Sequence, residues 1–320
     1  MLSSAMLRGA VYDSLPAFRS GRPRTEVGYL RPTEGLEIPF GVIEGHEPGP
    51  VLLVTAGVHG AEFCSIEAAL RLLRQPPATL RGTLVILPIL NIEGFRARSI
   101  FVMPEDGRNL NHVFPGSAAG SASERLAHWL VTHVYPNVDA YLDLHNGDLV
   151  ESLVPFTLFP IASAASRDLA VVFGLGIAVA TPGKGFAIDA ASRLGVPSII
   201  AEVSGNGLWS EAMVGQLHRG IERVLHHLGM TGVAPQPTLA SERLVTKWDP
   251  RAACDGLWYP ARNLSDPVQV GEVLGEITDL FGNTLQNVRS EVGGFILYQL
   301  TSLSVRTGEA LLGVATPLAT

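Results

Sequence analysis

A histidine and a glutamate stand where an apolar run meets a helix-like pattern. The segment reads GVHGAE (57–62), so His59 precedes Glu62 by three residues, between VLLVTA and EFCSIEAALRLL. Zinc in hydrolytic sites typically takes three imidazole or carboxylate ligands and keeps one position for water. His145 ends the apolar run AYLDLH and should emerge at the same edge of an α/β sheet, where ligands bind. We therefore predict a site for one Zn²⁺ per chain at His59, Glu62 and His145.

Two further carboxylates stand at or near the ends of apolar runs. Asp143 precedes His145 by two residues, on the same face of a strand, where it could orient a ligating imidazole. Glu202 lies in IIAEVSGNG, before a glycine-containing loop, and is a candidate general base. Taken singly, these residues also fit structural roles: His59 in a surface turn, His145 as a hydrogen-bonded strand end, and Glu202 as a capping or ion-paired carboxylate.

A polar, turn-rich loop lies between these motifs. It reads PEDGRNLNHVFPG (104–116) and contains Arg108, Asn111 and His112. Loops carry binding residues more often than the strands that position them, although a loop of this composition can be purely connective. We take these three side chains as candidate substrate-binding residues.

The chain alternates short apolar runs with helical patterns, which is typical of an α/β domain. The runs are too apolar for a sheet with one exposed face, so we predict a mostly buried, partly parallel sheet flanked by helices. The predicted strands are 51–57, 82–90, 139–145 and 197–203, and the predicted helices are 62–74, 121–135 and 210–230.

The sequence pattern changes after residue 230. Residues 231–241 (TGVAPQPTLAS) are rich in proline and small polar residues and are typical of a linker. From residue 242 onward, short runs are separated by glycine and Asn/Asp turns, without a long helical period. We predict a catalytic domain over 1–235 and a small all-β domain over 236–320.

The composition disfavours several classes of protein. The chain of 320 residues has a net charge of −7, so we expect no basic surface for nucleic acid or for an anionic membrane. Its two cysteines, Cys64 and Cys254, cannot build a disulfide framework or a cysteine zinc cluster. No secretory apolar region and no long uncharged apolar span is present. We expect a cytoplasmic protein with a small-molecule partner, and a homo-oligomer is compatible with the sequence.

Five ordered motifs resemble those of the succinylglutamate desuccinylase/aspartoacylase family, a branch of the zinc carboxypeptidase superfamily. An ordered set of this kind is far more specific than a His-x-x-Glu pair alone. The resemblance covers most of the chain and rests on GPVLLVTAGVHGAE (49–62), GTLVILPILNIEGF (82–95), PEDGRNLNHVFPG (104–116), YLDLHNGD (141–148), AEVSGNG (201–207) and the β-rich tail. It implies a mixed sheet like that of zinc carboxypeptidases, flanked by helices, with a small C-terminal all-β domain.

The resemblance also implies a role for each candidate residue. The three predicted metal ligands would hold one zinc ion, and Glu202 would act as general base and proton shuttle. An arginine ahead of the asparagine loop would polarise the scissile carbonyl and stabilise its oxyanion. Arg98 in RARSIF is our first choice for this arginine, with Arg96 and Arg108 as rivals.

One motif departs from the family pattern. The family loop usually reads N-L-N-R-x-F-P-G, and its Asn-Arg pair grips the substrate carboxylate, whereas this chain has Asn111 followed by His112. Arginine offers a fixed bidentate fork, while histidine offers one or two donors and is only partly charged at neutral pH. The carboxylate is then bound more weakly, bound by another residue such as Arg193, or absent from the substrate.

The residues and the resemblance together predict a zinc-dependent hydrolase that cleaves the amide of a small N-acyl amino acid or a related acylated amine. A metallocarboxypeptidase or an esterase would use the same site, although loss of the Asn-Arg pair disfavours the carboxypeptidase. A binding protein on an inactive hydrolase fold is the non-enzymatic alternative, and retention of all the ligand and base residues argues against it. A serine hydrolase is disfavoured because no G-x-S-x-G motif is present.

Overall fold

A large mixed β-sheet runs through most of the protein. The computed structural model describes residues 9–232, 234–235 and 242–318. The strands before residue 236 are β1 (Val11–Tyr12), β2 (Arg24–Thr33), β3 (Leu36–Glu44), β4 (Glu47–Ala56), β5 (Arg81–Leu87), β6 (Ala140–His145), β7 (Glu151–Leu153), β8 (Phe156–Pro160), β9 (Ile177–Thr181) and β10 (Ser198–Glu202). The strands after residue 241 are β11 (Arg243–Trp248), β12 (Gly256–Pro260), β13 (Pro267–Val268), β14 (Val273–Thr278), β15 (Thr284–Arg289), β16 (Gly294–Leu300), β17 (Ser304–Val305) and β18 (Leu312–Pro317). The α-helices are α1 (Phe63–Arg74), α2 (Ile92–Ala97), α3 (Ala122–Trp129), α4 (Ala164–Phe173), α5 (Ala187–Arg193) and α6 (Glu211–His227).

The central strands of this sheet are parallel. Among the described residues the strand order is β1-β2-β3-β5-β4-β6-β10-β8-β9-β11-β18-β16-β13, with β7 paired to β16. β4 pairs in parallel with β5 and β6, and β6 pairs in parallel with β10, so the carboxyl ends of these strands meet at one edge. The buried runs predicted as strands lie in β4, β5, β6 and β10, and the predicted α/β class is confirmed.

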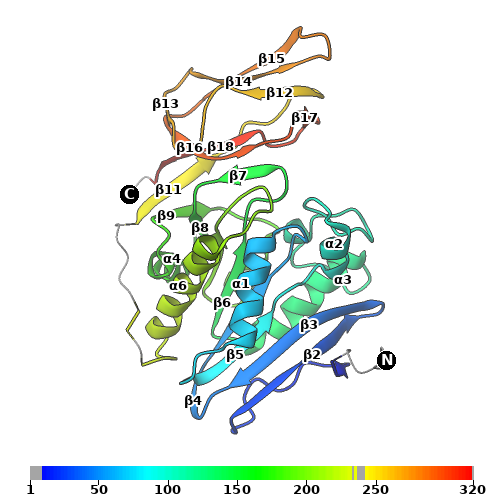
Figure 1. Ribbon diagram of the computed structural model, residues 1–320, viewed down its shortest axis with the longest axis vertical. Coiled ribbons are helices and arrows are strands. Elements are labelled where there is room, and N and C mark those ends of the chain that lie inside the picture. The colour runs from blue at the N-terminus through cyan, green and yellow to red at the C-terminus, as the bar shows by residue number, and fades with distance from the viewer. Residues whose placement is uncertain (1–8, 233, 236–241, 319–320) are drawn as a thin grey trace.

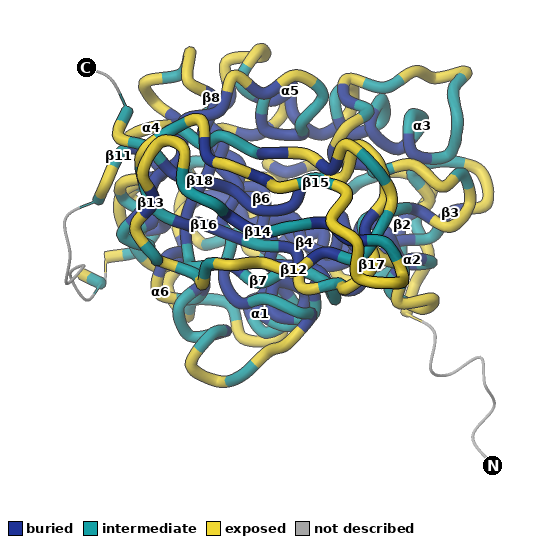
Figure 2. The backbone as a smooth tube through the Cα atoms, turned by 90° about the horizontal axis from the view of Figure 1, so that it is seen from above, coloured by how far each residue is buried: buried dark blue, intermediate teal, exposed yellow. Residues whose placement is uncertain are grey.

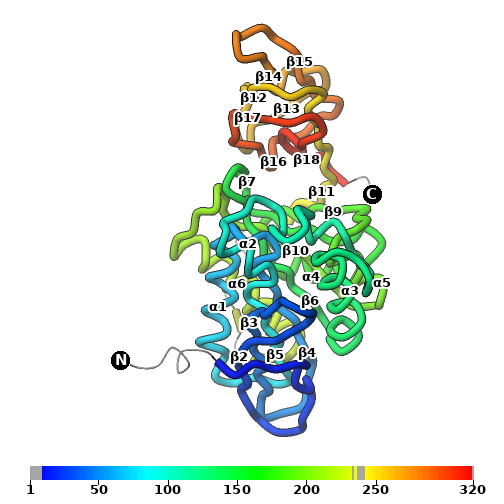
Figure 3. The backbone as a smooth tube through the Cα atoms, turned by 90° about the vertical axis from the view of Figure 1, so that its right-hand side faces the viewer, coloured from blue at the N-terminus to red at the C-terminus, as the bar shows by residue number. Residues whose placement is uncertain are grey.

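Helices cover both faces of the sheet. α1, α4 and α6 pack on one face, and α3 and α5 pack on the other (Figures 1 and 3). Because successive strand residues point to opposite faces, Leu53 of β4 joins the core beneath α3 and α5, while Leu52 and Val54 join the core beneath α1, α4 and α6. Seen from above, the buried segments labelled β4 and β6 lie in the middle of the molecule (Figure 2). The carboxyl ends of β4 and β6 are therefore supported by packed side chains on both faces of the sheet.

The predicted helix over 121–135 is interrupted. α3 ends at Trp129, and the chain continues as a π-helical turn (Leu130–Val134) and a 3₁₀ turn (Tyr135–Asn137). Pro136 lacks a backbone N–H, and its ring would clash with the carbonyl of Thr132 in a continued α-helix. The predicted helix ends at residue 135, just before this proline, but its periodicity does not show the change from α- to π-helix at Leu130.

The strands after residue 241 extend the main sheet and add a second one. β11 pairs in parallel with β9, and β16 pairs antiparallel with β7 and β18. The described strands β15, β14, β12 and β17 form a separate antiparallel sheet, in that order, at the upper end of the molecule in Figure 1. Most of the predicted linker, residues 236–241, lies outside the described residues, so the division into domains at 235 stays a prediction. No helix in the described part of the chain is both long and apolar enough to cross a bilayer.

The turn that carries His59 packs tightly against α2. The amide of Asn91 donates a hydrogen bond to the carbonyl of Gly57 at 2.8 Å. A Cβ atom added to Gly60 would lie 2.0 Å from the carbonyl carbon of Gly94 and 2.1 Å from the amide nitrogen of Phe95. Glycine is needed at position 60 because the clash is with backbone, which cannot rotate away.

We expect Gly60→Ala to lower the free energy of unfolding by roughly 1–3 kcal/mol, the usual cost of forcing atoms into a packed site. Chemical denaturation measures this change. Gly293→Ala is the matched control, because the nearest atom to its added Cβ is 3.7 Å away. An equal loss of stability in the two variants would contradict the close approach at Gly60.

Candidate metal and catalytic site

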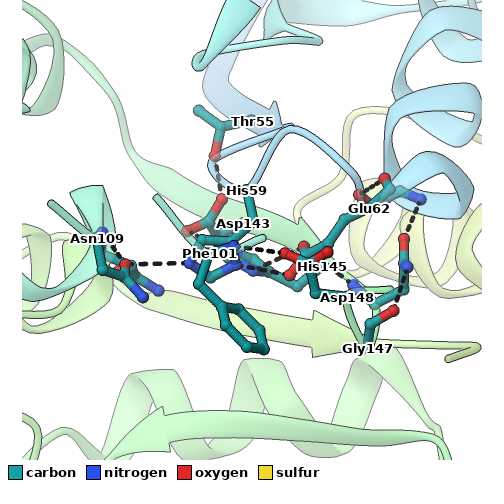
Figure 4. Close-up of polar contacts among 12 residues, drawn as sticks. Thr55, His59, Glu62, Phe101, Asn109, Asp143, His145, Gly147 and Asp148 are labelled. Atoms are coloured by element: carbon teal, nitrogen blue, oxygen red, sulfur yellow. Dashed lines mark hydrogen bonds and ion pairs between the residues drawn. The ribbon is translucent and has the colours of Figure 1, made fainter. Parts of the chain in front are cut away.

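Three side chains converge at the carboxyl edge of the sheet. The Nδ1 atom of His59 lies 2.6 Å from Oε1 of Glu62, and the Nδ1 atom of His145 lies 3.0 Å from Oε2 of the same carboxylate (Figure 4). All three residues are buried, and one ligand atom of each lies within 4.8 Å of the others. The structure thus brings together the residues that the sequence predicts as metal ligands.

The distal nitrogen of each imidazole faces an oxygen atom. His59 Nε2 lies 3.1 Å from Asn109 Oδ1, and His145 Nε2 lies 3.1 Å from Asp143 Oδ2. The second contact has an ion-pair distance, but its angles fall short of a hydrogen bond. Amide and carboxylate oxygens only accept, so the proton of each neutral imidazole belongs on Nε2 and the lone pair on Nδ1. Both lone pairs then point toward the Glu62 carboxylate.

This arrangement favours positive charge among the three groups. Burial disfavours the charged imidazoles, but the Glu62 carboxylate outweighs it and raises the pKa of His59, and Glu62 and Asp143 raise the pKa of His145 well above its usual range. Burial also opposes ionisation of Glu62, yet His145 and His59 lower its pKa to about 2. Two imidazoles and one carboxylate are a ligand set that zinc accepts, so the residues fit a zinc ion.

Asp143 is held in place by its neighbours on β4 and β6. The Thr55 hydroxyl donates to Asp143 Oδ1 at 2.5 Å, and the Tyr141 hydroxyl lies 2.9 Å from Thr55 Oγ1. Thr55 has one hydroxyl proton, which it gives to Asp143, so Tyr141 must donate to Thr55. All three residues are buried. These hydrogen bonds fix the carboxylate that faces His145, which is consistent with the orienting role expected for Asp143.

Glu202 lies beside the cluster on the neighbouring strand. It is the last residue of β10 and is in register with His145, the last residue of β6. Its carboxylate makes no hydrogen bond or ion pair with any residue that the structure describes. Burial raises the pKa of Glu202 well above its usual range; His145 opposes this rise, and Glu62, Glu151 and Asp143 reinforce it. A carboxyl group of this kind can accept a proton and return it near neutral pH.

The loops around the cluster contain residues that the sequence reasoning missed. Asp148 is buried and accepts hydrogen bonds from the amides of Phe101 and Leu149, at 2.7 and 2.6 Å. Phe101 has a φ of 59°, and its ring lies 5.7 Å from that of His59. Asn109 lies in the motif NLN and Asp148 in the motif HNGD. Their place in these motifs is the only feature of the sequence that could have identified them as site residues. Nothing in the sequence pointed to Phe101.

The candidate arginines differ in their partners. Three of them form ion pairs: Arg96 with Glu93, Arg108 with Glu124 at 3.0 Å, and Arg193 with Asp189 at 2.9 Å. Arg98 follows α2 in the left-handed conformation, and its exposed side chain has no hydrogen bond or ion pair within the described ranges. No described contact joins any of the four guanidinium groups to the metal-ligand cluster.

Asn111 links the loop to α5. Its side chain is buried, and Oδ1 accepts a hydrogen bond from the amide of Ala187 at 2.9 Å. Ala187 is the first residue of α5, where the backbone N–H groups have no partner within the helix. The structure therefore gives the side-chain oxygen of Asn111 a positioning role, and a substrate contact through this residue stays a prediction.

His112 lies at the surface within electrostatic reach of the cluster. Its ring contacts that of Phe186, with 5.4 Å between centroids. Desolvation by neighbouring atoms lowers the pKa of His112, and the charges of His59, Arg251 and Lys247 lower it further. The lowered pKa makes His112 a poor replacement for the permanent charge of an arginine, and Lys247 of β11 and Arg251 lie within electrostatic reach of it.

Comparison with a known family model agrees with these motifs. The model of the succinylglutamate desuccinylase/aspartoacylase catalytic domain matches residues 48–228, more than half of the chain. The chain belongs to this family. The matched residues include the three predicted metal ligands and Glu202.

Relatives of this family resemble the chain over most of its length. An N-alpha-acetyl-L-2,4-diaminobutyric acid deacetylase of Halomonas elongata is 28% identical over 299 residues, covering 87% of this chain and 85% of that protein. A solved succinylglutamate desuccinylase/aspartoacylase from Rhodobacter sphaeroides is 26% identical with a TM-score of 0.81, covering 93% of this chain and 97% of that one. The product-bound ectoine utilization protein EutE (DoeB) of Ruegeria pomeroyi has a TM-score of 0.84 at 24% identity, covering 95% and 98% of the two chains, and shows the shared fold.

We expect the zinc affinity of the protein to fall steeply as the pH is lowered. Zinc needs neutral imidazoles, and because the pKa values of His59 and His145 are raised, protons compete at higher pH than at ordinary histidines. Where both imidazoles must lose a proton, the affinity should change by about 100-fold per pH unit. Competition with a chelating dye between about pH 6 and about pH 8 measures this slope, and a flat profile would contradict the assigned ligands.

Proposed function

We propose that this protein is a zinc-dependent deacylase that hydrolyses the amide bond of a small N-acyl amino acid or a related acylated amine. The proposal rests on the buried cluster of His59, Glu62 and His145 with the unpartnered carboxylate of Glu202 beside it. Membership of the family supports it, as does the Halomonas elongata relative, whose name is that of a deacetylase. One zinc ion per chain is part of the proposal.

The protein side chains have distinct tasks in this reaction. A zinc ion held by the cluster would supply Lewis-acid chemistry, lowering the pKa of a water molecule and polarising the scissile carbonyl. Glu202 accepts the proton of the attacking water and returns it to the leaving nitrogen. The raised pKa of Glu202 suits both transfers, because a carboxyl group of ordinary pKa is a poor proton donor near neutral pH. Asn109 and Asp143 keep the two imidazoles oriented.

Arg98 is the arginine we assign to the oxyanion. A guanidinium group without a carboxylate partner keeps its full charge and its donors for a substrate. Arg96 and Arg108 are already ion-paired, whereas Arg98 has no such partner among the described residues. Its place just after α2, which packs against the His59 turn, keeps it close in the chain to the site.

Replacing Glu202 by glutamine keeps the shape of the side chain and removes its ability to take a proton. We expect Glu202→Gln to lower the turnover of N-acyl amino acids by about 100- to 10,000-fold. Zinc content should stay at about one ion per chain, because Glu202 is not one of the three ligands. Elemental analysis and amine release measure the two quantities.

Glu222→Gln is the control, since Glu222 is exposed on α6. It should keep the wild-type turnover. Unchanged turnover in Glu202→Gln would overturn the assignment of the base.

A further inference from the structure

A second carboxylate near the site has no part in this mechanism. Glu151 is the first residue of β7, shortly after the loop that begins at His145. Its backbone carbonyl accepts a hydrogen bond of 2.6 Å from the amide of Asn206, in the loop that follows Glu202. Glu151 therefore lies between the loop of a metal ligand and the loop of the proposed base.

The side chain of Glu151 has no protein partner. Its carboxylate makes no hydrogen bond or ion pair with any described residue. Lys247 and Tyr298 are close enough to interact with its charge, but both are engaged by Asp249. Lys247 forms an ion pair with Asp249, and the Tyr298 hydroxyl donates to Asp249 at 2.9 Å. Glu151 is half-buried, so its carboxylate is open to a partner from outside the chain.

The charge of Glu151 influences the proposed base, Glu202. Burial raises the pKa of Glu151 to about 7, and the Glu62 carboxylate reinforces the rise. Glu151 in turn adds to the rise in the pKa of Glu202, for which burial is the largest cause. In the proposed reaction Glu202 hands a proton to the leaving nitrogen, so the amine part of the substrate lies next to it. Glu151 is therefore within electrostatic reach of the place where this amine part lies.

We propose that Glu151 binds a cationic group on the amine part of the substrate. This inference rests on the proposed deacylase function and narrows its substrates to N-acyl derivatives of diamino acids. The Halomonas elongata relative is named for such a compound, N-alpha-acetyl-L-2,4-diaminobutyric acid. The second amine of this compound carries a positive charge at neutral pH. The same carboxylate disfavours an acidic amine part, such as glutamate or aspartate, because like charges repel.

The test compares two substrates that differ only in this charge. Nα-acetyl-L-2,4-diaminobutyrate ends in an ammonium group, and Nα-acetyl-L-norvaline has a methyl group in its place. We expect the wild-type enzyme to hydrolyse the first with a kcat/KM at least about tenfold higher. Glu151→Gln should lower kcat/KM for the cationic substrate by about 10- to 100-fold, the usual loss on removing a charged hydrogen-bond partner, and should change the norvaline derivative less than about threefold.

Two further variants test whether the charge at position 151 causes the preference for the cationic substrate. Glu151→Asp keeps the charge and should retain part of the preference for the cationic substrate. Glu291→Gln removes an exposed carboxylate and should leave both rates unchanged. Thermal unfolding of each variant shows whether the fold is intact, and calorimetry of L-2,4-diaminobutyrate against L-norvaline measures the same charge preference by binding alone.

The outcomes separate this inference from the function on which it rests. Hydrolysis of both substrates without preference in the wild type, or an equal change of both rates in Glu151→Gln, would overturn the role of Glu151 and leave the deacylase standing. Hydrolysis of neither substrate, nor of any other N-acyl amino acid, by the zinc-loaded wild type would overturn the proposed function itself.

Discussion

Positive charge between His59, Glu62 and His145 is the condition on which the rest of the site depends. The two Nδ1 atoms lie 2.6 and 3.0 Å from one buried carboxylate, and a lone pair that points at an anion is repelled unless a proton or a metal ion lies between them. Asn109 and Asp143 lie next to the Nε2 atoms of the two imidazoles, so the Nδ1 lone pairs point toward Glu62. Attraction between the Glu62 carboxylate and the two imidazoles raises the pKa of each histidine and lowers the pKa of Glu62.

The parallel strands and the C-terminal strands hold this site from two sides. β4, β6 and β10 bring the cluster and Glu202 to one edge, and their buried side chains fill the cores on both faces of the sheet. From the other side, β16 pairs with β7, and the Thr301 hydroxyl donates to Asn206 Oδ1 at 2.6 Å. Asn206 belongs to the loop that follows the proposed base. The tail is therefore part of the support of the site, and Lys247, which pairs with Asp249, lies within electrostatic reach of Glu151.

The sequence alone predicts those parts of the site that depend on local pattern. His59, His145 and Glu202 each follow or end a buried apolar run, and the ends of parallel strands meet at one edge, so their proximity can be inferred without coordinates. Glu62 follows from its spacing to His59. The contacts of Asn109 and Glu151 join segments far apart in the chain, and no periodicity encodes them. Likewise, spacing could not tell Arg98 from its rivals, because what distinguishes these arginines is whether a carboxylate lies beside each one in the fold.

Zinc per chain is the measurement that tests the account most directly. Elemental analysis of the purified wild type after zinc is supplied should give about one ion per chain, and His145→Ala beside it should give close to none, because the loss of one of three ligands leaves too weak a site. Equal zinc in the two proteins would place the metal elsewhere, and no zinc in either would contradict the hydrolase and leave a binding protein on this fold.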